Sequence, residues 1–222
     1  MRVRAPASGR APASAVLAAA ALMVLASCSG AGTPKTVPVH GEYADAARAA
    51  YERARARAYA PRRFKTLFSG EVAQNVGGIA RGYLSAWWDG RRLVWKTSAP
   101  LAGAGGGGTL SLDAPRSGPV PFPGELDGRD AIGVLLGVLD LAPTGPVSSS
   151  HDGFRVSLDE RGRAALLDER LRIVGLELPD GTRVRYEPGD GIPRRIDAKS
   201  RDGSAHLELS SFGDWPASEP IP

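Results

Sequence analysis

The sequence predicts an α+β domain that is mainly β and is built on an antiparallel sheet. Most of the chain after residue 63 consists of short runs in which apolar and polar residues alternate. Turn signals such as Asp89-Gly90 and Asp202-Gly203 separate these runs, as expected for hairpins. Only two segments have helical spacing, and no strand–helix–strand rhythm indicates a parallel sheet. The alternation also predicts one wet and one dry face for the sheet.

The N-terminus has the pattern of a cleavable secretory signal. Three arginines precede an apolar run, residues 15–26, that is too short to span a bilayer. The run ends in Leu25-Ala26-Ser27-Cys28, which resembles the bacterial lipobox. That resemblance implies cleavage before Cys28, a diacylglyceryl thioether on its sulfur and an acylated amino terminus. Ser29, where Asp would imply retention in the inner membrane, implies the outer membrane. The alternative is an unmodified cysteine in an ordinary signal.

Composition limits what the mature chain can be. Removing residues 1–27 takes away 3 of 28 basic residues and none of the 24 acidic ones, which leaves 195 residues with a net charge of +1. This charge gives no case for nucleic-acid binding, which needs a clustered basic face. The length fits one domain, and no cysteine remains for a disulfide.

The expected elements follow in chain order. Residues 28–40 are predicted to be a lipidated, flexible tether, because Gly, Ser, Thr and Pro dominate them, and Pro34 and Pro38 argue against a strand. The domain, 41–222, begins with a helix over 42–59 that Pro61 ends. Its alanine-rich stripe suits packing on a sheet better than binding to a membrane surface, because alanine offers little bulk to lipid.

Strands and a second helix complete the domain. A meander is expected over 64–72, 83–88 and 92–97, with a further strand over 109–113 after a run of glycines. Apolar residues at i, i+3, i+4 and i+7 predict a buried helix over 128–140, with Asp127 as its N-cap. The remaining strands are expected over 154–158, 165–168, 171–178, 184–186, 192–198 and 205–209.

No catalytic or metal constellation stands out. His206 and Glu208 share a strand face but have no further ligand at metal spacing, and the glycine run lacks the Lys-Ser/Thr of a phosphate loop. No serine occupies a nucleophile elbow, and the acidic pairs at 159–160 and 168–169 are expected to be solvated surface. We therefore expect a protein that is not an enzyme and uses no cofactor or metal.

The order of elements resembles LolB and the wider group that contains LolA. The best local match is the stretch 84–103, in which Trp88 ends a strand and Pro100-Leu101 follows the next hairpin. Ile192-Pro193 and the late aromatics Phe212 and Trp215 also fit that pattern. Ala102, where the family usually has Gly, and the extra glycines after it leave the alignment of the next strand open.

This resemblance implies an incomplete (half) β-barrel: one curved antiparallel sheet with helices covering its open side. Its apolar concave face would receive the acyl chains of lipoproteins from a soluble LolA-like carrier and help to insert them in the outer membrane. The protein would be a monomer, held at the membrane by its N-terminal lipid and facing the periplasm. Leu101, beside Pro100, would project into lipid; the alternative is that it packs on the sheet. Candidate groove residues are Phe68, Leu84, Trp88, Trp95, Leu135, Leu136, Leu139, Phe154, Val156, Val184, Tyr186 and Leu207.

Two other interpretations remain open at this stage. An envelope lipoprotein with the same fold could bind or sense a lipid or glycolipid without transferring lipoproteins. A structural envelope protein could instead offer its sheet to a protein partner, and a filled core without a cavity would favour that role.

Overall fold

A computed structural model describes residues 37–75, 78–98, 106–113 and 120–220, all of which belong to one compact unit, Thr36–Pro222. The predicted lipidation site, Cys28, and the predicted insertion residues, Pro100 and Leu101, lie outside the described residues. None of the helices within the described ranges has both the length and the apolar character that a membrane crossing requires.

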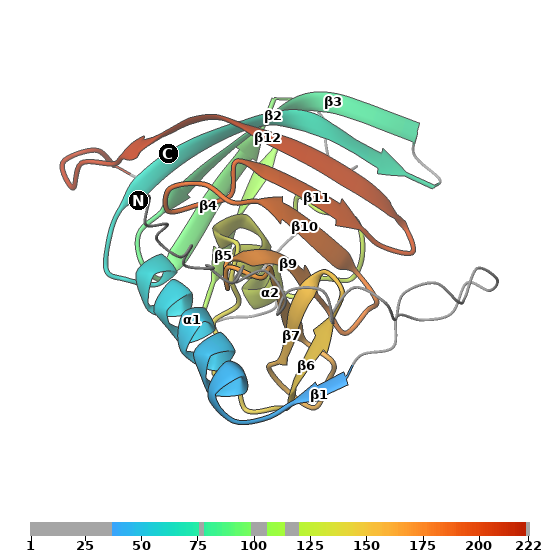
Figure 1. Cartoon of the computed structure of the whole chain (residues 1–222). Helices are drawn as coiled ribbons and strands as arrows, with labels where there is room; N and C mark the ends of the chain where they lie inside the picture. The colour runs from blue at the N-terminus through green and yellow to red at the C-terminus, as the bar shows by residue number, and fades with distance from the viewer. Residues whose placement is uncertain (1–36, 76–77, 99–105, 114–119, 221–222) are drawn as a thin grey trace, which may run out of the picture. The chain divides into compact units, whose positions relative to one another are not determined.

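The described residues form a single 12-stranded antiparallel sheet (Figure 1). Its order is β1-β6-β7-β8-β9-β10-β11-β12-β2-β3-β4-β5, so β1 and β5 are its two edges and the sheet is not closed. The strands are β1 (Val37–Val39), β2 (Phe64–Gln74), β3 (Gly78–Trp88), β4 (Arg92–Thr97), β5 (Gly107–Ser111), β6 (Val147–Ser150), β7 (Gly153–Ser157), β8 (Ala164–Leu167), β9 (Ile173–Glu177), β10 (Arg183–Glu187), β11 (Arg195–Lys199) and β12 (Gly203–Asp214).

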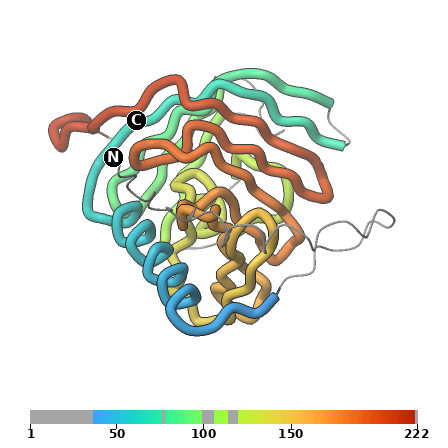
Figure 2. Tube along the Cα trace, viewed as in Figure 1, coloured from blue at the N-terminus to red at the C-terminus, as the bar shows by residue number. Residues whose placement is uncertain are grey.

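The predicted alternation is confirmed along the strands. In β10 and β11 every second residue is buried and the residues between are exposed. The last strand, β12, pairs with β2 over its whole length, so two segments far apart in the sequence lie side by side (Figure 2). The long β2 and β3 place Gly70 opposite Gly82. A side chain at Gly70 would lie 2.0 Å from the carbonyl oxygen of His206, so only glycine fits this close approach.

Two strands were not predicted from the pattern. The first, β1, lies inside the expected tether, and Pro38 pairs with Ser148 there. Proline is tolerated because an edge strand such as β1 has a neighbour on one side only, so fewer of its backbone N–H groups take part in the hydrogen bonds of the sheet. The second, β6, has the sequence Val-Ser-Ser-Ser, which shows no apolar alternation. Its register comes from its neighbours β1 and β7, which is information that a local pattern does not contain.

Both predicted helices are present. The first, α1 (Glu42–Ala58), buries alanines and Tyr51 on one side, and its acidic residues Glu42 and Asp45 fall in the first turn, where they complement the helix dipole. The second, α2 (Gly128–Leu136), begins as predicted at Asp127, whose side chain accepts a hydrogen bond from the backbone N–H of Asp130 at 2.8 Å. It ends earlier than expected, because Gly137 takes a left-handed conformation and caps it.

The contacts of α2 require the sheet to curve. This helix packs against β5, and Arg129 donates to the carbonyl of Leu112 just after that strand at 2.7 Å. On another side, the Tyr186 hydroxyl of β10 donates to the carbonyl of Val134 at 3.1 Å. In the sheet order β5 and β10 are six strands apart, about 29 Å in a flat sheet at about 4.8 Å a step. A helix about 10–12 Å wide touches both only if the sheet bends around it.

Candidate functional site

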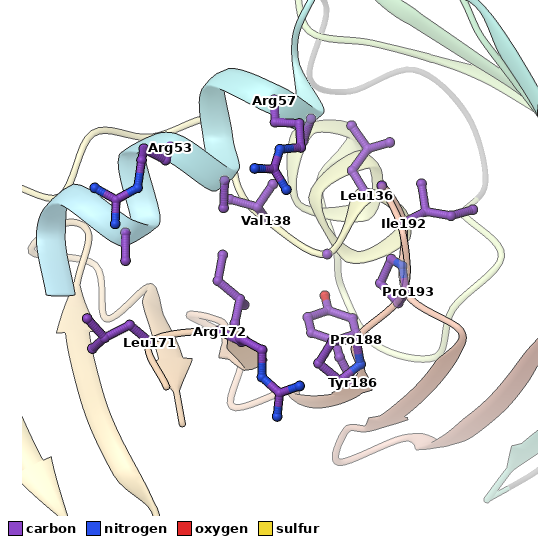
Figure 3. Close-up of a pocket in the computed structure, with 17 residues that line it drawn as sticks. Arg53, Arg57, Leu136, Val138, Leu171, Arg172, Tyr186, Pro188, Ile192 and Pro193 are labelled. Carbon is purple, nitrogen blue, oxygen red and sulfur yellow. The ribbon is translucent and has the colours of Figure 1, made fainter. Parts of the chain in front are cut away.

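An open cavity of about 340 Å³ lies beneath α1. Its roof is one face of α1, and its floor comes from residues at β9 and β10, including Ile173, Tyr186 and Pro188. The C-terminal end of α2 and the loop before β11 close one side with Leu136, Val138, Ile192 and Pro193 (Figure 3). The volume is at the lower end of the range of about 300–1,000 Å³ typical of small-molecule sites.

The face of α1 over this cavity combines small side chains with arginines. Ala50, Ala54 and Ala58 follow one another at four-residue spacing, and Arg53 and Arg57 form a second row beside them. In Figure 3 both arginines hang from the side of α1 that faces Leu171 and Tyr186. The alanines let the helix lie near the sheet, and the two guanidinium groups stand at the exposed rim of the cavity.

Arg53 and Arg57 differ from the other arginines of this helix. Arg48 pairs with Asp45 at 3.2 Å, and Arg55 pairs with Glu52 at 3.0 Å and with Asp140 at 3.3 Å. Across residues 37–75, 78–98, 106–113 and 120–220, Arg53 and Arg57 have no ion pair and no hydrogen bond. The rim of the cavity therefore carries two positive charges that none of the described residues pairs with.

A strained turn brings Leu171 into the cavity wall. The segments Asp159-Glu160-Arg161-Gly162-Arg163 and Asp168-Glu169-Arg170-Leu171-Arg172 are near copies. In each, the aspartate accepts hydrogen bonds from the backbone N–H groups two and four residues later. The fourth position is left-handed in both, with φ 92° at Gly162 and φ 59° at Leu171.

Leu171 is the single non-glycine residue with positive φ in the described part of the chain. Glycine fits this conformation without cost, as in the first copy, whereas an L residue there costs about 1–2 kcal/mol. The strained conformation places the leucine side chain in the wall of the cavity. Such outliers are concentrated at functional positions, which singles out this turn.

Arg172, the next residue, also lines the cavity but is already neutralised. Its guanidinium group donates to Asp168 at 2.7 Å, and in Figure 3 it points away from α1. Burial alone would raise the pKa of Asp168, but hydrogen bonds from Arg172 and Arg170 hold it below its ordinary value. Arg172 therefore adds little free charge to the rim.

Three tyrosine hydroxyls join the elements that line the cavity. Tyr51 of α1 and Tyr59, which caps the end of α1, donate to the carbonyls of Leu139 and Val138 at 2.8 and 2.9 Å, and Tyr186 of β10 donates to α2. Burial raises the pKa values of all three phenols, so they remain protonated donors. They fix the position of α1 over the cavity with few contacts.

A second polar cluster lies at the other end of α2. The Arg163 guanidinium group, with only 10 % of its side chain exposed, donates to both oxygens of Asp130 at 2.8 Å, to Asp159 at 3.0 Å and to Asp127 at 3.1 Å. Hydrogen bonds to Asp130 raise the pKa of Arg163 above its ordinary value. Asp159, expected to be solvated surface, is therefore a structural ligand of a buried arginine.

The predicted groove residues lie mainly in the interior of the domain. Eleven of the twelve are buried, and they belong to one continuous hydrophobic cluster; Phe154 is partly buried and packs against it. Two of them, Leu136 and Tyr186, also line the cavity beneath α1. The large side chains of Phe68, Trp88 and Trp95 are fully covered and fill the curve of the sheet.

The histidines add no metal site. His206 contacts Asp197, and its other ring nitrogen lies 3.5 Å from Glu208 on the same exposed strand face. Within the described ranges, no group of three or more potential ligands is arranged to hold a metal ion.

The cavity residues Arg53 and Arg57 were not predicted, although the sequence holds a signal for them. Arg48 and Arg55 each have an acidic residue three positions before them, where a helix places an ion-pair partner. The positions three and four residues away from Arg53 and Arg57 contain only alanine, proline or the other arginine. Helical arginines without an acidic neighbour at these spacings have no partner on their own helix. For the strained turn at Leu171, the signal in the sequence is the repeated Asp-Glu-Arg-x-Arg segment.

Comparisons with known proteins give similarity at the level of structure. No model of a protein family and no curated protein matches the chain. Among solved structures, the chain is similar to a LolA-superfamily protein from Nitrosomonas europaea, with 13% identity over 77% of this chain and 94% of the other, and a TM-score of 0.46.

Two further solved structures are similar to a smaller extent. A putative outer membrane lipoprotein-sorting protein domain from Vibrio parahaemolyticus has 11% identity over 79% of this chain and 94% of its own, with a TM-score of 0.43. A DUF1329 family protein from Desulfovibrio piger has 12% identity over 81% of this chain and 96% of its own, with a TM-score of 0.35. Likeness of this size assigns no function.

Proposed function

We propose that the protein is a lipid-anchored envelope protein that binds an acyl chain in the cavity beneath α1 and takes part in moving lipids or lipoproteins to the outer membrane. It would act without covalent chemistry, as a monomeric carrier or acceptor. Acyl chains would be held by the burial of their surface, at about 25 cal/mol for each Å² removed from water.

The observation that carries this proposal is the apolar cavity wall that includes a strained leucine. Leu136, Ile192 and the ring of Tyr186 give the cavity an apolar side, and Leu171 lines the cavity at a cost that its twin turn avoids. A leucine in the wall of a solvent-filled crevice adds no stabilising contact, whereas a bound alkyl chain would bury apolar surface against it.

We further propose that α1 and α2 cover the open side of a half-barrel and that an acyl chain enters along α1. The curve of the sheet is filled by large side chains such as Trp88 and Trp95, so a chain longer than the cavity would need α1 to move outward. The few polar contacts that hold α1, chiefly those of Tyr51 and Tyr59, suit such a movement.

The first test compares the two copies of the turn. Leu171→Gly should weaken binding of a fluorescent alkyl probe by roughly tenfold, since it removes a leucine side chain from the wall, while the free energy of unfolding stays within about 1 kcal/mol because strain is relieved. The matched control, Gly162→Leu, places the strain in the copy away from the cavity and should destabilise the protein without changing probe binding. Equal probe affinity for wild type and Leu171→Gly would rule out this cavity as the acyl site.

The second test concerns the anchor and the transfer step. Mass spectrometry of the native mature protein should find an acylated Cys28, and Cys28→Ser should release the protein from the outer membrane. In a transfer assay from a soluble carrier to vesicles, Leu101→Glu should still accept a lipoprotein but fail to insert it. Normal insertion by this variant would remove Leu101 from the mechanism, and an unmodified Cys28 would remove the lipid anchor.

The filled interior favours a second candidate, a structural envelope protein that offers its sheet to a partner. Phe68, Trp88 and Trp95 are fully buried inside the curve of the sheet, as in a purely structural domain. The two functions separate on one measurement: lipid extraction of the purified native protein followed by mass spectrometry. A stoichiometric acyl compound supports the carrier, and none, together with no uptake of an alkyl probe, supports the structural role.

A further inference from the structure

We infer that the cavity selects an acyl chain that ends in an anionic group, a carboxylate or a phosphate, and that Arg53 and Arg57 bind that group. This inference rests on the proposed acyl binding and goes further by assigning the ligand's charge. It places the head group at the exposed rim beneath α1 and the chain over the apolar side formed by Leu136 and Ile192.

The rim of the cavity carries two positive charges close together. Arg53 and Arg57 are one helical turn apart on α1, with Cβ atoms about 5–6 Å from each other, so one small anion can contact both guanidinium groups. Both line the cavity, and within the described residues neither has a protein partner, in contrast to Arg48 and Arg55 on the same helix. Two unpaired like charges side by side disfavour each other, and an anion between them removes that repulsion.

The charged groups around Arg53 and Arg57 include a further arginine and acids that are mostly paired elsewhere. Arg62 stands behind the cavity wall, where its guanidinium group donates to the carbonyl of Gly191 at 3.1 Å. Burial lowers the pKa of Arg62, and the positive charge of Arg57 lowers it further, while Asp214 acts in the opposite direction. The acids near the cavity are mostly engaged: Asp168 holds Arg172, and Glu52 and Asp140 hold Arg55. Asp190 lies between two lining glycines but does not itself line the cavity.

The cavity is divided into a charged rim and an apolar side. Arg53 and Arg57 project from α1, and the groups farther along the cavity, Leu136, Ile192 and Pro193, are apolar (Figure 3). A wholly apolar ligand would leave the arginines unused, and a free anion would leave the apolar side exposed to water. An anionic amphiphile matches both parts in one orientation.

The test measures binding of dodecanoate, dodecyl phosphate and dodecanol, below their aggregation limits, to the mature protein at low salt. We expect the two anions to bind at least roughly tenfold more tightly than dodecanol, with the preference falling as salt screens the charges. The double variant Arg53→Gln, Arg57→Gln should lose the preference and bind the three dodecyl compounds with similar affinity. The matched control on the same helix, Arg48→Gln, should keep it. Inorganic phosphate alone should bind far more weakly than dodecyl phosphate.

The outcomes are distinct. If no dodecyl compound binds, the proposed acyl binding itself is overturned. If all three bind with equal affinity, or the double variant keeps the preference, the acyl site stands and the anionic selectivity is overturned. Inorganic phosphate binding as tightly as dodecyl phosphate would make the rim an anion site without an acyl role. A preference for dodecanoate over dodecyl phosphate, or the reverse, supports the inference and identifies the type of head group.

Discussion

The two helices of this protein are held in opposite ways. Eight of the nine residues of α2 are buried; Asp127 caps its first turn, and Arg163 ties the same end to three carboxylates. In α1, 17 residues long, only five are buried, four of them alanines, and two tyrosine hydroxyls supply much of its polar attachment. The difference indicates that α2 is a fixed part of the core, whereas α1 is the wall that can yield to a ligand.

The largest effect is expected from breaking the fixed helix. Arg163→Met should lower the free energy of unfolding by about 3–5 kcal/mol, because it leaves Asp130 buried without its cationic partner. Urea unfolding of the mature protein measures this change. Arg161→Met, two residues away and exposed, should stay within about 0.5 kcal/mol. A loss below about 1 kcal/mol for Arg163→Met would contradict the view that α2 is held by this cluster.

A smaller effect is expected from loosening the other helix. Tyr51→Phe should cost about 1–2 kcal/mol, since the carbonyl of Leu139 loses its buried donor. Hydrogen exchange should speed up along α1 and stay nearly unchanged in α2, because the lost contact holds only α1. Tyr43→Phe provides the matched control, since Tyr43 is 70 % exposed at the start of the same helix. Equal acceleration in both helices would mean that they open as one unit.

The stability contributed by Asp168, which pairs with the cavity-lining Arg172, should depend on pH. Asp168 has a pKa held below its ordinary value of 3.8 in the folded protein, so it contributes stability above that pH and loses it as the pH falls through the folded value. Asp168→Asn should therefore be less stable than wild type at about pH 6 and approach it at about pH 3. Urea unfolding at both pH values checks this. A constant difference at both pH values would contradict the assignment.

The smallest effect is expected from the ion pair between Arg48 and Asp45 on α1. Arg48→Gln breaks this pair, in which the Asp45 side chain is 77 % exposed, and a long hydrogen bond to the carbonyl of Gly145 at 3.4 Å, and should change the free energy of unfolding by less than about 0.5 kcal/mol. Thermal unfolding should leave the midpoint almost unchanged. A loss above about 1 kcal/mol would show that α1 depends on its outer ion pairs and is held more firmly than we infer.

The sequence by itself determined the elements whose signals are local. The helix that starts at Glu42, the cap at Asp127 and the alternation of β10 and β11 follow from spacing and capping within a few residues. The turn at Leu171 and the lack of an acidic partner for Arg53 and Arg57 are also written in the sequence, as a repeated motif and a spacing. These features need no knowledge of the rest of the chain.

Tertiary structure alone decided what depends on residues far apart. The pairing of β1 with β6 spans more than 100 residues, and the contacts of Arg163 with Asp127 and Asp130 cross from a strand end to a helix start. Periodicity assigns Trp88, Leu136 and Tyr186 alike to an apolar face. Only the packing of α1 and α2 separates the first, sealed in the core, from the other two, which reach the cavity. The physical reason is that burial on folding is set by which surfaces meet, and that depends on the curve of the whole sheet.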